Sequence, residues 1–286
     1  MLGEKMEEAK EAGLLAILNI ATRNERNKII LLQFGVLSSI VELLQSQSTR
    51  LRELATAGIL TLSSPDSNKP LILASGAPSL LVEVIISGNI QGQVDAVTAM
   101  YNLSTCQQGF DARICLKSAF HLLALLKDCK KLSKFAEKAT TLLDLLSTSQ
   151  EGRDAITESE GSILTLVETV EDGSPLAAEY ATSILLNICK SCRDKYRELI
   201  LNEGPIPSLL LLTVHGTDRA QGLAHTLLQL LRDNSKQNRV STEELQCMVY
   251  KIVSHVDGPE KALETAGNIL KDVTGRDPVV GIVEMN

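Results

Sequence analysis

The sequence predicts an all-α protein, a right-handed superhelix of stacked helical repeats. Three observations predict it: one long segment recurs every 41 to 43 residues, a glycine recurs between its copies, and 44% of residues are hydrophobic but only 3% aromatic. A core without Trp must be built from Leu, Ile, Val and Ala, which favours helices that meet at close range. A fixed period of this length is typical of repeat folds.

The long recurring segment has the pattern of a helix with one apolar face. Its copies begin at Glu11, Glu53, Val94, Glu137, Glu179 and Gly222. The third position is small in every copy: Gly13, Ala55, Ala96, Ala139, Ala181 and Ala224. The seventh and tenth positions are large and apolar, so the three positions have the i, i+4, i+7 spacing of one helix face. The small residue lets a neighbouring helix approach closely.

A second recurring segment carries a glycine near its start. At this position the five copies have Gly35, Gly76, Ser118, Gly161 and Gly204. Glycine suits a sharp turn that needs positive φ. Pro78 and Pro207 fall within the first turn of the next helix, where a missing N–H costs little. A short segment precedes each turn, so each unit is predicted to run short helix, turn, helix, loop, long helix.

Three helices in about 42 residues, with a glycine turn and a long last helix ending in Asn-Leu, resemble the armadillo repeat. The resemblance covers roughly residues 11–233. The phrases NLSTCQQG, GPIPSLL and LTVHGTDRA are similar, more narrowly, to plant armadillo proteins whose repeats follow a U-box domain. No U-box is recognisable in the sequence.

The period divides the chain into four parts. Residues 1–26 are predicted to be a partial repeat with only its third helix, 27–237 five armadillo repeats, 238–274 capping helices, and 275–286 a flexible tail. The apolar face of the first part has no earlier repeat to pack on. We therefore expect either a longer parent sequence or a shortened form.

Composition and charge argue against several classes of protein. A net charge of −7 offers no general basic face for phosphates, so a nucleic-acid binder is not expected. Six Cys residues are too sparse for a disulfide framework and indicate reduced thiols. The N-terminus lacks the apolar region of a secretory signal, and no segment has the roughly 20 apolar residues of a membrane span. A cytoplasmic or nuclear protein without a membrane partner is predicted.

Motifs of catalysis and cofactor binding are not found in the sequence. It has no phosphate loop, dinucleotide fingerprint, zinc-protease helix or nucleophile elbow. Cys189 and Cys192 form a CxxC without the second pair that zinc needs, and ordinary packing explains them better. We therefore predict no enzyme activity, cofactor, metal site or small-molecule substrate.

The resemblance implies a concave groove lined by third helices, in which an Asn at the ninth position of the long segment clamps an extended peptide. Here that column contains Asn19, Asn102 and Asn187, and its other members are Thr61, Leu145 and Leu230. An amide both donates and accepts hydrogen bonds, so it can bond to the N–H and C=O groups of a peptide backbone without recognising particular side chains. Nuclear-import adaptors carry Trp four residues earlier, a position where this chain has no Trp. The alternative is that the Asn side chains bond only to neighbouring repeats.

Other residues flank this predicted groove. Glu53, Glu137 and Glu179 recur at the first position, either as an acidic edge for a basic partner or as solvated first-turn charges that complement the helix dipole. Tyr101 and Tyr180 are candidate aromatic anchors. A basic run, Lys127, Lys130, Lys131 and Lys134, surrounds Cys129, which we expect to be exposed.

The sequence thus predicts a non-catalytic scaffold that binds a protein or peptide segment in an armadillo groove. The alternative, which depends on the resemblance alone, is the substrate-recognition portion of a U-box-type ubiquitin ligase that lacks its U-box.

Overall fold

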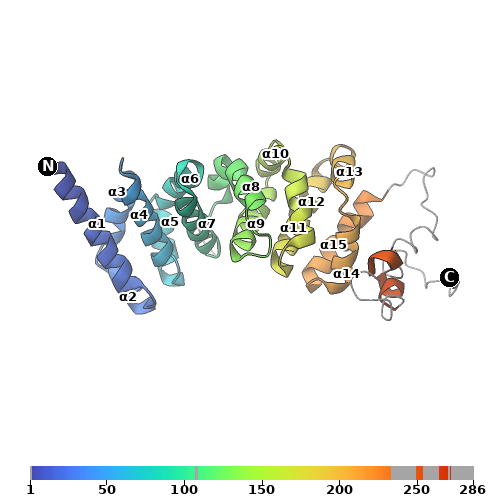
Figure 1. The fold of residues 1–286 in the computed structure, drawn as a ribbon, viewed down its shortest axis with the longest axis horizontal. Helices are drawn as coiled ribbons and strands as arrows, with labels where there is room; N and C mark the ends of the chain where they lie inside the picture. Colours follow the sequence, from blue (N-terminus) through green and yellow to red (C-terminus); the bar gives the residue numbers. More distant parts are fainter. Residues whose placement is uncertain (1, 107–108, 233–248, 254–263, 270, 272–286) are drawn as a thin grey trace. The chain divides into compact units, whose positions relative to one another are not determined.

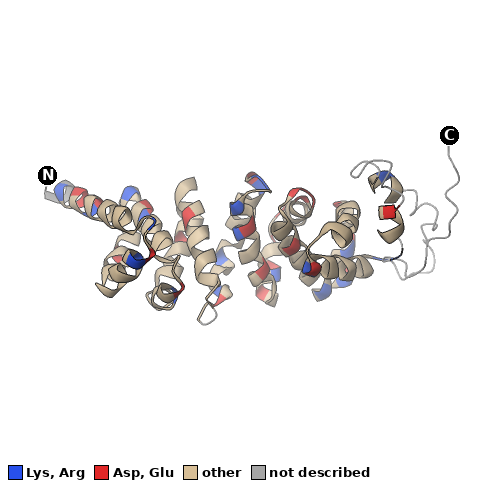
Figure 2. Ribbon diagram, turned by 90° about the horizontal axis from the view of Figure 1, so that it is seen from below, with Lys and Arg blue, Asp and Glu red and all other residues tan. Residues whose placement is uncertain are grey.

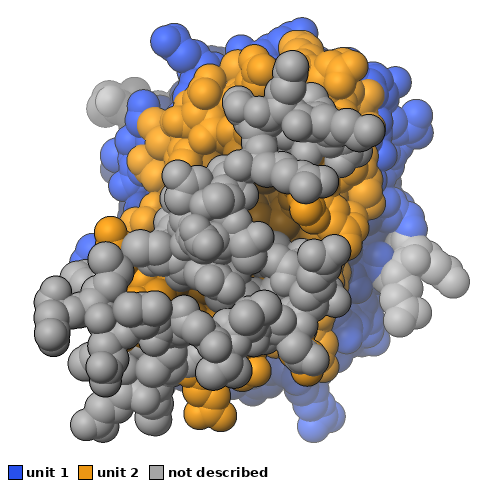
Figure 3. Space-filling model, turned by 90° about the vertical axis from the view of Figure 1, so that its right-hand side faces the viewer, with its two compact units in different colours: residues 1–162 blue, residues 163–286 orange. Residues whose placement is uncertain are grey.

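Helices and turns make up all the secondary structure in the residues that the computed structural model describes, which are 2–106, 109–232, 249–253, 264–269 and 271. These described ranges contain no strand. The chain divides into two units, residues 1–162 and 163–286, which are coloured separately in Figure 3. The division falls at the start of helix α11, and each unit is described by itself.

The helices follow the order that the period predicts. Unit 1 contains α1 (Leu2–Ala21), α2 (Glu25–Gln33), α3 (Val36–Leu44), α4 (Thr49–Leu62), η1 (Asp66–Asn68), α5 (Lys69–Ala74), α6 (Ala77–Ser87), α7 (Ile90–Ser104), η2 (Ala112–Ser118), α8 (Ala119–Asp128), α9 (Lys134–Ser147) and α10 (Gln150–Thr157). The helices α11 (Ser162–Asp172), α12 (Pro175–Ser191), α13 (Arg193–Asn202), α14 (Ile206–His215) and α15 (Asp218–Leu231) follow.

The long recurring segments form the helices α1, α4, α7, α9, α12 and α15, here called the long helices. In unit 1 α1 packs on α4, α4 on α7 and α7 on α9, and in unit 2 α12 packs on α15 (Figure 1). The small third position is fully buried in five copies: Ala55, Ala96, Ala139, Ala181 and Ala224. The first copy differs, because Gly13 is exposed and Ile20 at the tenth position is 52% exposed. The predicted apolar face is therefore confirmed for the other five copies.

Capping residues set where the long helices begin. The side-chain oxygens of Asn89, Ser133, Ser174 and Thr217 each accept a hydrogen bond from a backbone N–H of the first turn. Ser48 occupies the same place before α4 but makes no such side-chain bond. Asn, Ser and Thr are strong N-caps because they satisfy N–H groups that have no partner inside the helix.

The glycine turns have the predicted backbone conformation. Gly35, Gly76, Gly161 and Gly204 have φ between 71° and 81°, the left-handed region that favours glycine. Ser118 has φ −96°, and there the 3-10 helix η2 leads directly into α8. The turn at Ser118 therefore avoids the conformation that only glycine adopts easily. Pro78 and Pro207 are the second residues of α6 and α14, as predicted.

Two short helical stretches near the C-terminus pack on α14 within unit 2. Val249, Val253, Ala266 and Ile269 form a buried apolar cluster with Leu210 of α14. Except for Leu210, these residues fall within the predicted cap, 238–274. Most of the cap lies outside the described residues, and so does the predicted tail, 275–286. The predicted boundaries of repeats and cap stay predictions.

Within the described part of the chain, no single helix is both long and apolar enough to cross a membrane. Two bent pairs, α2 with α3 and α5 with α6, reach the necessary length and composition only when the two helices of each pair are counted together.

Two glycines in open space give a stability test of the turn geometry. A Cβ at Gly76 or at Gly13 would meet nothing within 4 Å, but only Gly76 has positive φ. Gly76→Ala is expected to lower the free energy of unfolding by about 1 kcal/mol. Gly13→Ala, inside α1, is expected to raise it by about 0.5–1 kcal/mol. Urea denaturation of both variants checks the signs, and the same sign for both would contradict the assignment of strain to φ.

Candidate functional site

The long helices of unit 1 present a face of small and polar side chains, here called the long-helix face and defined by the fifth and ninth positions of each long segment. In unit 1 these are Leu15, Ala57, Thr98 and Thr141, and Asn19, Thr61, Asn102 and Leu145. Each of the three threonines donates its hydroxyl to a backbone carbonyl one turn earlier in its own helix, at 2.7–2.8 Å. Those hydroxyl protons are satisfied, so the amides are the principal donors that this face offers a ligand.

Asn102 is tied to the neighbouring long helix. It is half-buried on α7, and its Nδ2 donates to Ser63 Oγ of α4's C-cap at 3.0 Å. The bond uses one of two amide N–H groups and orients the side chain. Asn19 is exposed on α1, and α4 lies between α1 and α7, with Thr61 at the corresponding position.

In unit 2 the long-helix face contains Asn187, half-buried on α12. Tyr180 lies on the same helix, and the guanidinium carbon of Arg219 is 5.5 Å from the centre of its ring, a cation–π contact. Tyr101 is half-buried on α7 of unit 1, next to Asn102. The structure therefore places three of the predicted residues, Asn19, Asn102 and Tyr101, in unit 1, and two, Asn187 and Tyr180, in unit 2.

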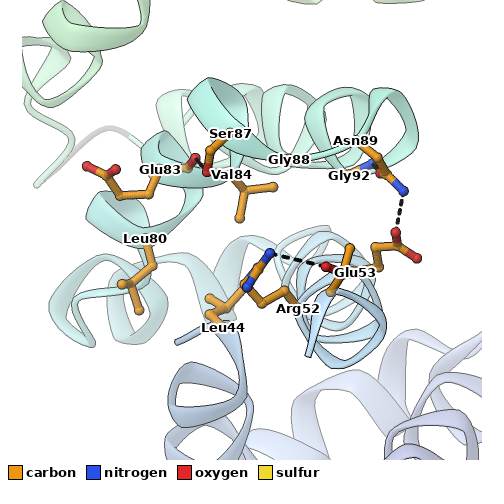
Figure 4. Close-up of a pocket in the computed structure, with 11 residues that line it drawn as sticks. Leu44, Arg52, Glu53, Leu80, Glu83, Val84, Ser87, Gly88, Asn89 and Gly92 are labelled. Atoms are coloured by element: carbon orange, nitrogen blue, oxygen red, sulfur yellow. Dashed lines mark hydrogen bonds between the residues drawn. The ribbon is translucent and has the colours of Figure 1, made fainter. Parts of the chain in front are cut away.

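The glutamates of the first position join consecutive long helices. Glu53 of α4 accepts a hydrogen bond from Asn89 Nδ2, the N-cap of α7. In unit 2 Glu179 of α12 accepts from Thr217 Oγ1, the N-cap of α15, and from Arg219 Nη1 at 2.8 Å. These bonds connect the first two turns of one long helix to the start of the next (Figure 4 shows Glu53 with Asn89).

A glutamate in α1 makes the same kind of connection, nearer to solvent. Glu11 accepts from Arg50 Nε of α4 at 2.9 Å. This bond raises the pKa of the Arg50 guanidinium.

The interpretation of these glutamates as solvated first-turn charges is wrong. Glu179 is 6% exposed, and Glu53 is half-buried. The helices α4 and α12 begin at Thr49 and Pro175, so both glutamates lie past the first turn. Glu137 does lie in the first turn of α9 and pairs with Lys134 at 3.0 Å, but its side chain is only 12% exposed, so it is not solvated either.

Basic partners thus accompany the acidic residues. Figure 2 shows Lys and Arg interspersed with Asp and Glu along the helices of each unit. The described helices therefore do not support a continuous acidic edge.

The partners of these glutamates were missed by the sequence reasoning. Asn89 and Thr217, the partners of Glu53 and Glu179, each lie five residues before a long segment begins, and Ser48 and Ser174 occupy the same position in their repeats. Arg50 and Arg219 share a position three residues before it. Recurrence of small hydrogen-bonding residues at one offset was the available signal, since such residues favour helix starts.

The cysteines are placed differently from expectation. Cys129 is half-buried, its Sγ donates to Leu126 O at 3.3 Å, and burial raises the pKa of its thiol, so the prediction that it is exposed is wrong. The loop folds back because Lys131 Nζ also donates to Leu126 O, at 2.6 Å. Of the CxxC pair, Cys189 is buried and Cys192 exposed. Among the residues with described placement, no three His, Cys, Asp or Glu side chains gather as metal ligands would.

Comparison with known sequences settles the family. Residues 15–250 match the family described as "Plant U-box protein ARM repeat region". The chain belongs to this family. It is 30% identical over 247 residues to U-box domain-containing protein 45 of Arabidopsis thaliana, covering 86% of this chain and 31% of that protein. It is 28% identical over 302 residues to U-box domain-containing protein 17 of the same plant, covering 90% and 40%. The chain thus spans about a third of the length of these relatives.

Solved structures agree with the armadillo fold. A designed armadillo repeat protein superposes with a TM-score of 0.58 at 20% identity, covering 78% of this chain and 93% of the design. Another, solved in complex with the peptide (KR)4, has a TM-score of 0.54 at 21% identity, covering 77% and 92%. The predicted all-α armadillo fold is confirmed.

The buried carboxylate of Glu179 is expected to stabilise unit 2 strongly. Glu179→Gln keeps the shape but removes the charge that Arg219 and Thr217 contact. We expect the free energy of unfolding to fall by about 1–3 kcal/mol, because hydrogen bonds to buried charged groups are among the strong ones. Glu11→Gln is the matched control, since the Glu11 side chain is 36% exposed where that of Glu179 is 8% exposed, and its effect should be much smaller. Equal effects in urea denaturation would contradict the role assigned to Glu179.

Thiol reactivity tests the placement of the cysteines. Burial raises the pKa of Cys115 to about 12, so at pH 8 only about one Cys115 thiol in ten thousand is ionised. Cys192 is exposed and is expected to react with a maleimide many times faster. Peptide mass spectrometry after timed labelling measures both rates. Labelling of Cys115 at the rate of Cys192 in the folded protein would show that α8 and η2 are packed differently.

Proposed function

We propose that this chain is a non-catalytic scaffold that binds an extended segment of a partner protein along its long-helix face. The amides of Asn19 and Asn102 in unit 1 and of Asn187 in unit 2 bond to the backbone of the segment. The observation that carries the proposal is the placement of Asn102, which Ser63 orients through one N–H. Its second N–H and its carbonyl oxygen match the alternating groups of an extended chain.

Two further features support this mode of binding. Side chains at the fifth position are small in every copy except the first, which has Leu15, so a segment can approach the amides closely. Tyr101 and Tyr180 flank the face as aromatic anchors. A designed armadillo protein of the same fold was solved with a bound peptide. In this proposal Glu53, Glu137 and Glu179 lie at the edge of the long-helix face and hold its helices in position.

The test uses peptides selected against the wild-type chain from a random display library. Asn102→Ala combined with Asn187→Ala is expected to weaken binding of a selected peptide by about 5- to 160-fold, because each lost backbone hydrogen bond is worth about 0.5–1.5 kcal/mol. Fluorescence anisotropy measures the affinity, and circular dichroism confirms that the variant is folded.

Ser63→Ala is the matched control. It removes the same bond between α4 and α7 but leaves the Asn102 amide in place. We expect similar stability to the Asn102→Ala variant and at most a modest loss of peptide affinity. Unchanged affinity in the folded double-Asn variant would refute the groove mechanism.

We also propose a second role, the substrate-recognition portion of a U-box-type ubiquitin ligase. The family match over residues 15–250 and the names of the relatives favour it. The relevant assay fuses a U-box to the chain and supplies ubiquitin-activating and ubiquitin-conjugating enzymes. The fusion is expected to ubiquitylate a protein that carries the selected peptide, and the double-Asn fusion is not. Equal ubiquitylation by both fusions would contradict this role.

A further inference from the structure

The second helix of each repeat is α3, α6, α8, α11 or α14. In four of these five helices, a side chain donates a hydrogen bond to a carbonyl at the C-terminal end. The last carbonyls of a helix have no partner inside it and need a donor from elsewhere. After α3, Arg52 Nη1 donates to Ser46 O at 2.8 Å and to Gln47 O at 3.3 Å. After α6, Gln93 Nε2 donates to Ile85 O at 2.9 Å.

The same arrangement recurs at two further helix ends. Lys131 Nζ donates to Leu126 O of α8, and Gln221 Nε2 donates to Gly216 O after α14 at 3.1 Å. The C-terminal ends of α3, α6, α8 and α14 therefore each receive a nitrogen donor from a side chain nearby in sequence.

The end of α11 departs from this pattern. Arg52, Gln93 and Gln221 each stand directly before a long segment, and the residue at that position in α12 is Ala178. Within the part of the chain that the structure describes, no side chain donates to the carbonyl of Asp172 or Gly173, which correspond to Ser46 and Gln47.

A cleft lies beside Ala178, and Lys251 and Ile252 also line it. In unit 1 the hollow beside Arg52, between α4 and α6, has a volume of about 60 Å³ (Figure 4). The corresponding hollow in unit 2, beside Ala178 and between α12 and α14, has about 580 Å³. Its lining includes Val170, Gly173, Pro175, Ala178, Leu211 and Leu212. We call it the Ala178 cleft.

The charges of the Ala178 cleft suit a cation at one wall. Glu171 lines the cleft from the last turn of α11, and the carbonyl end of a helix carries partial negative charge. His215 of α14 and Lys251 line it from other elements. Glu171 and Gly173 both line the cleft, so its acidic wall lies at the uncapped end of α11.

We propose that the Ala178 cleft receives an arginine side chain of a partner protein. The guanidinium takes the place that Arg52 fills in unit 1 and donates to the carbonyls of Asp172 and Gly173. Its apolar stem packs on Val170, Pro175 and Leu212. Arginine is the expected residue because Arg52 fills the equivalent place in unit 1, where its Nη1 donates to two carbonyls at once. The cleft is separate from the long-helix face, so this inference does not depend on the proposed function.

The probe is a fluorescein-labelled peptide with arginine between two leucines and a serine at each end. A second peptide carries citrulline, the neutral analogue of arginine, and a third carries leucine at that position. Anisotropy is expected to show the arginine peptide binding at least tenfold more tightly than the leucine peptide, with citrulline between them. The amide signal of Gly173 in NMR is expected to shift with the arginine peptide.

Two variants copy the caps of the other helices into unit 2. Ala178→Arg copies Arg52, and Ala178→Gln copies Gln93 and Gln221. Each is expected to occupy the part of the cleft beside the end of α11, raise the unfolding midpoint and weaken binding of the arginine peptide at least tenfold. Ala12→Arg, at an exposed position of α1, adds the same charge and should leave binding unchanged. Arg52→Ala is expected to open the hollow in unit 1 and to create a second site for the same peptide.

Three outcomes would overturn the proposal. The first is equal affinity for the leucine and arginine peptides, which would make the cleft a purely apolar site. The second is retained binding by both folded Ala178 variants. The third is no binding of the arginine peptide up to about 1 mM, which corresponds to a binding free energy weaker than about −4 kcal/mol.

Discussion

Close packing of consecutive long helices is the constraint on which the rest of the structure depends. Ala55, Ala96 and Ala139 have no exposed surface, so their helices meet with only a methyl group between them. Large aliphatic side chains such as Ile59 fill the space beyond, each contributing about 1.5–3 kcal/mol by burial. A repeat of this kind buries its apolar face only against its neighbours, so the spacing between helices is set locally at every step.

Polar bonds fix the two ends of the same contact. Between α4 and α7 the pair Glu53–Asn89 joins the helix starts, and Asn102–Ser63 joins the helix ends. Non-directional burial sets the distance between helices, while these directional bonds restrict sliding along the axis. Asn102 is thereby both a structural residue and a candidate ligand contact, because its amide has more hydrogen-bonding capacity than Ser63 uses. The two interpretations of that column are compatible.

The periodic features of the fold could be predicted from the sequence. Hydrogen bonds between residues far apart in the chain could not. Buried columns, glycine turns and prolines follow from spacing and backbone chemistry, so they were predictable residue by residue. The acceptor role of Glu53 and Glu179 was not, because their partners lie 36 to 40 residues away and depend on where the next helix begins. Cys129 was misjudged because the loop around it folds back onto α8 through Lys131, a contact that no period reveals.

The repeats of one chain can be compared with one another, so a single difference between them, such as Ala178 in place of arginine, is informative. Arg52 and Ala178 occupy equivalent positions between equivalent helices, so the missing side chain accounts for part of the difference in cleft volume. Other lining residues differ as well, among them Leu80 and Ser208, and Lys251 and Ile252 line only the larger cleft. Gly173 lines an open cleft, where water can hydrate its carbonyl at little cost. A ligand there must replace that water's hydrogen bonds. An apolar side chain cannot do so, whereas a guanidinium offers stronger, charge-assisted bonds along with a stem for the apolar wall. The cleft is therefore expected to select its ligands by the hydrogen bonds that they make as much as by their shape.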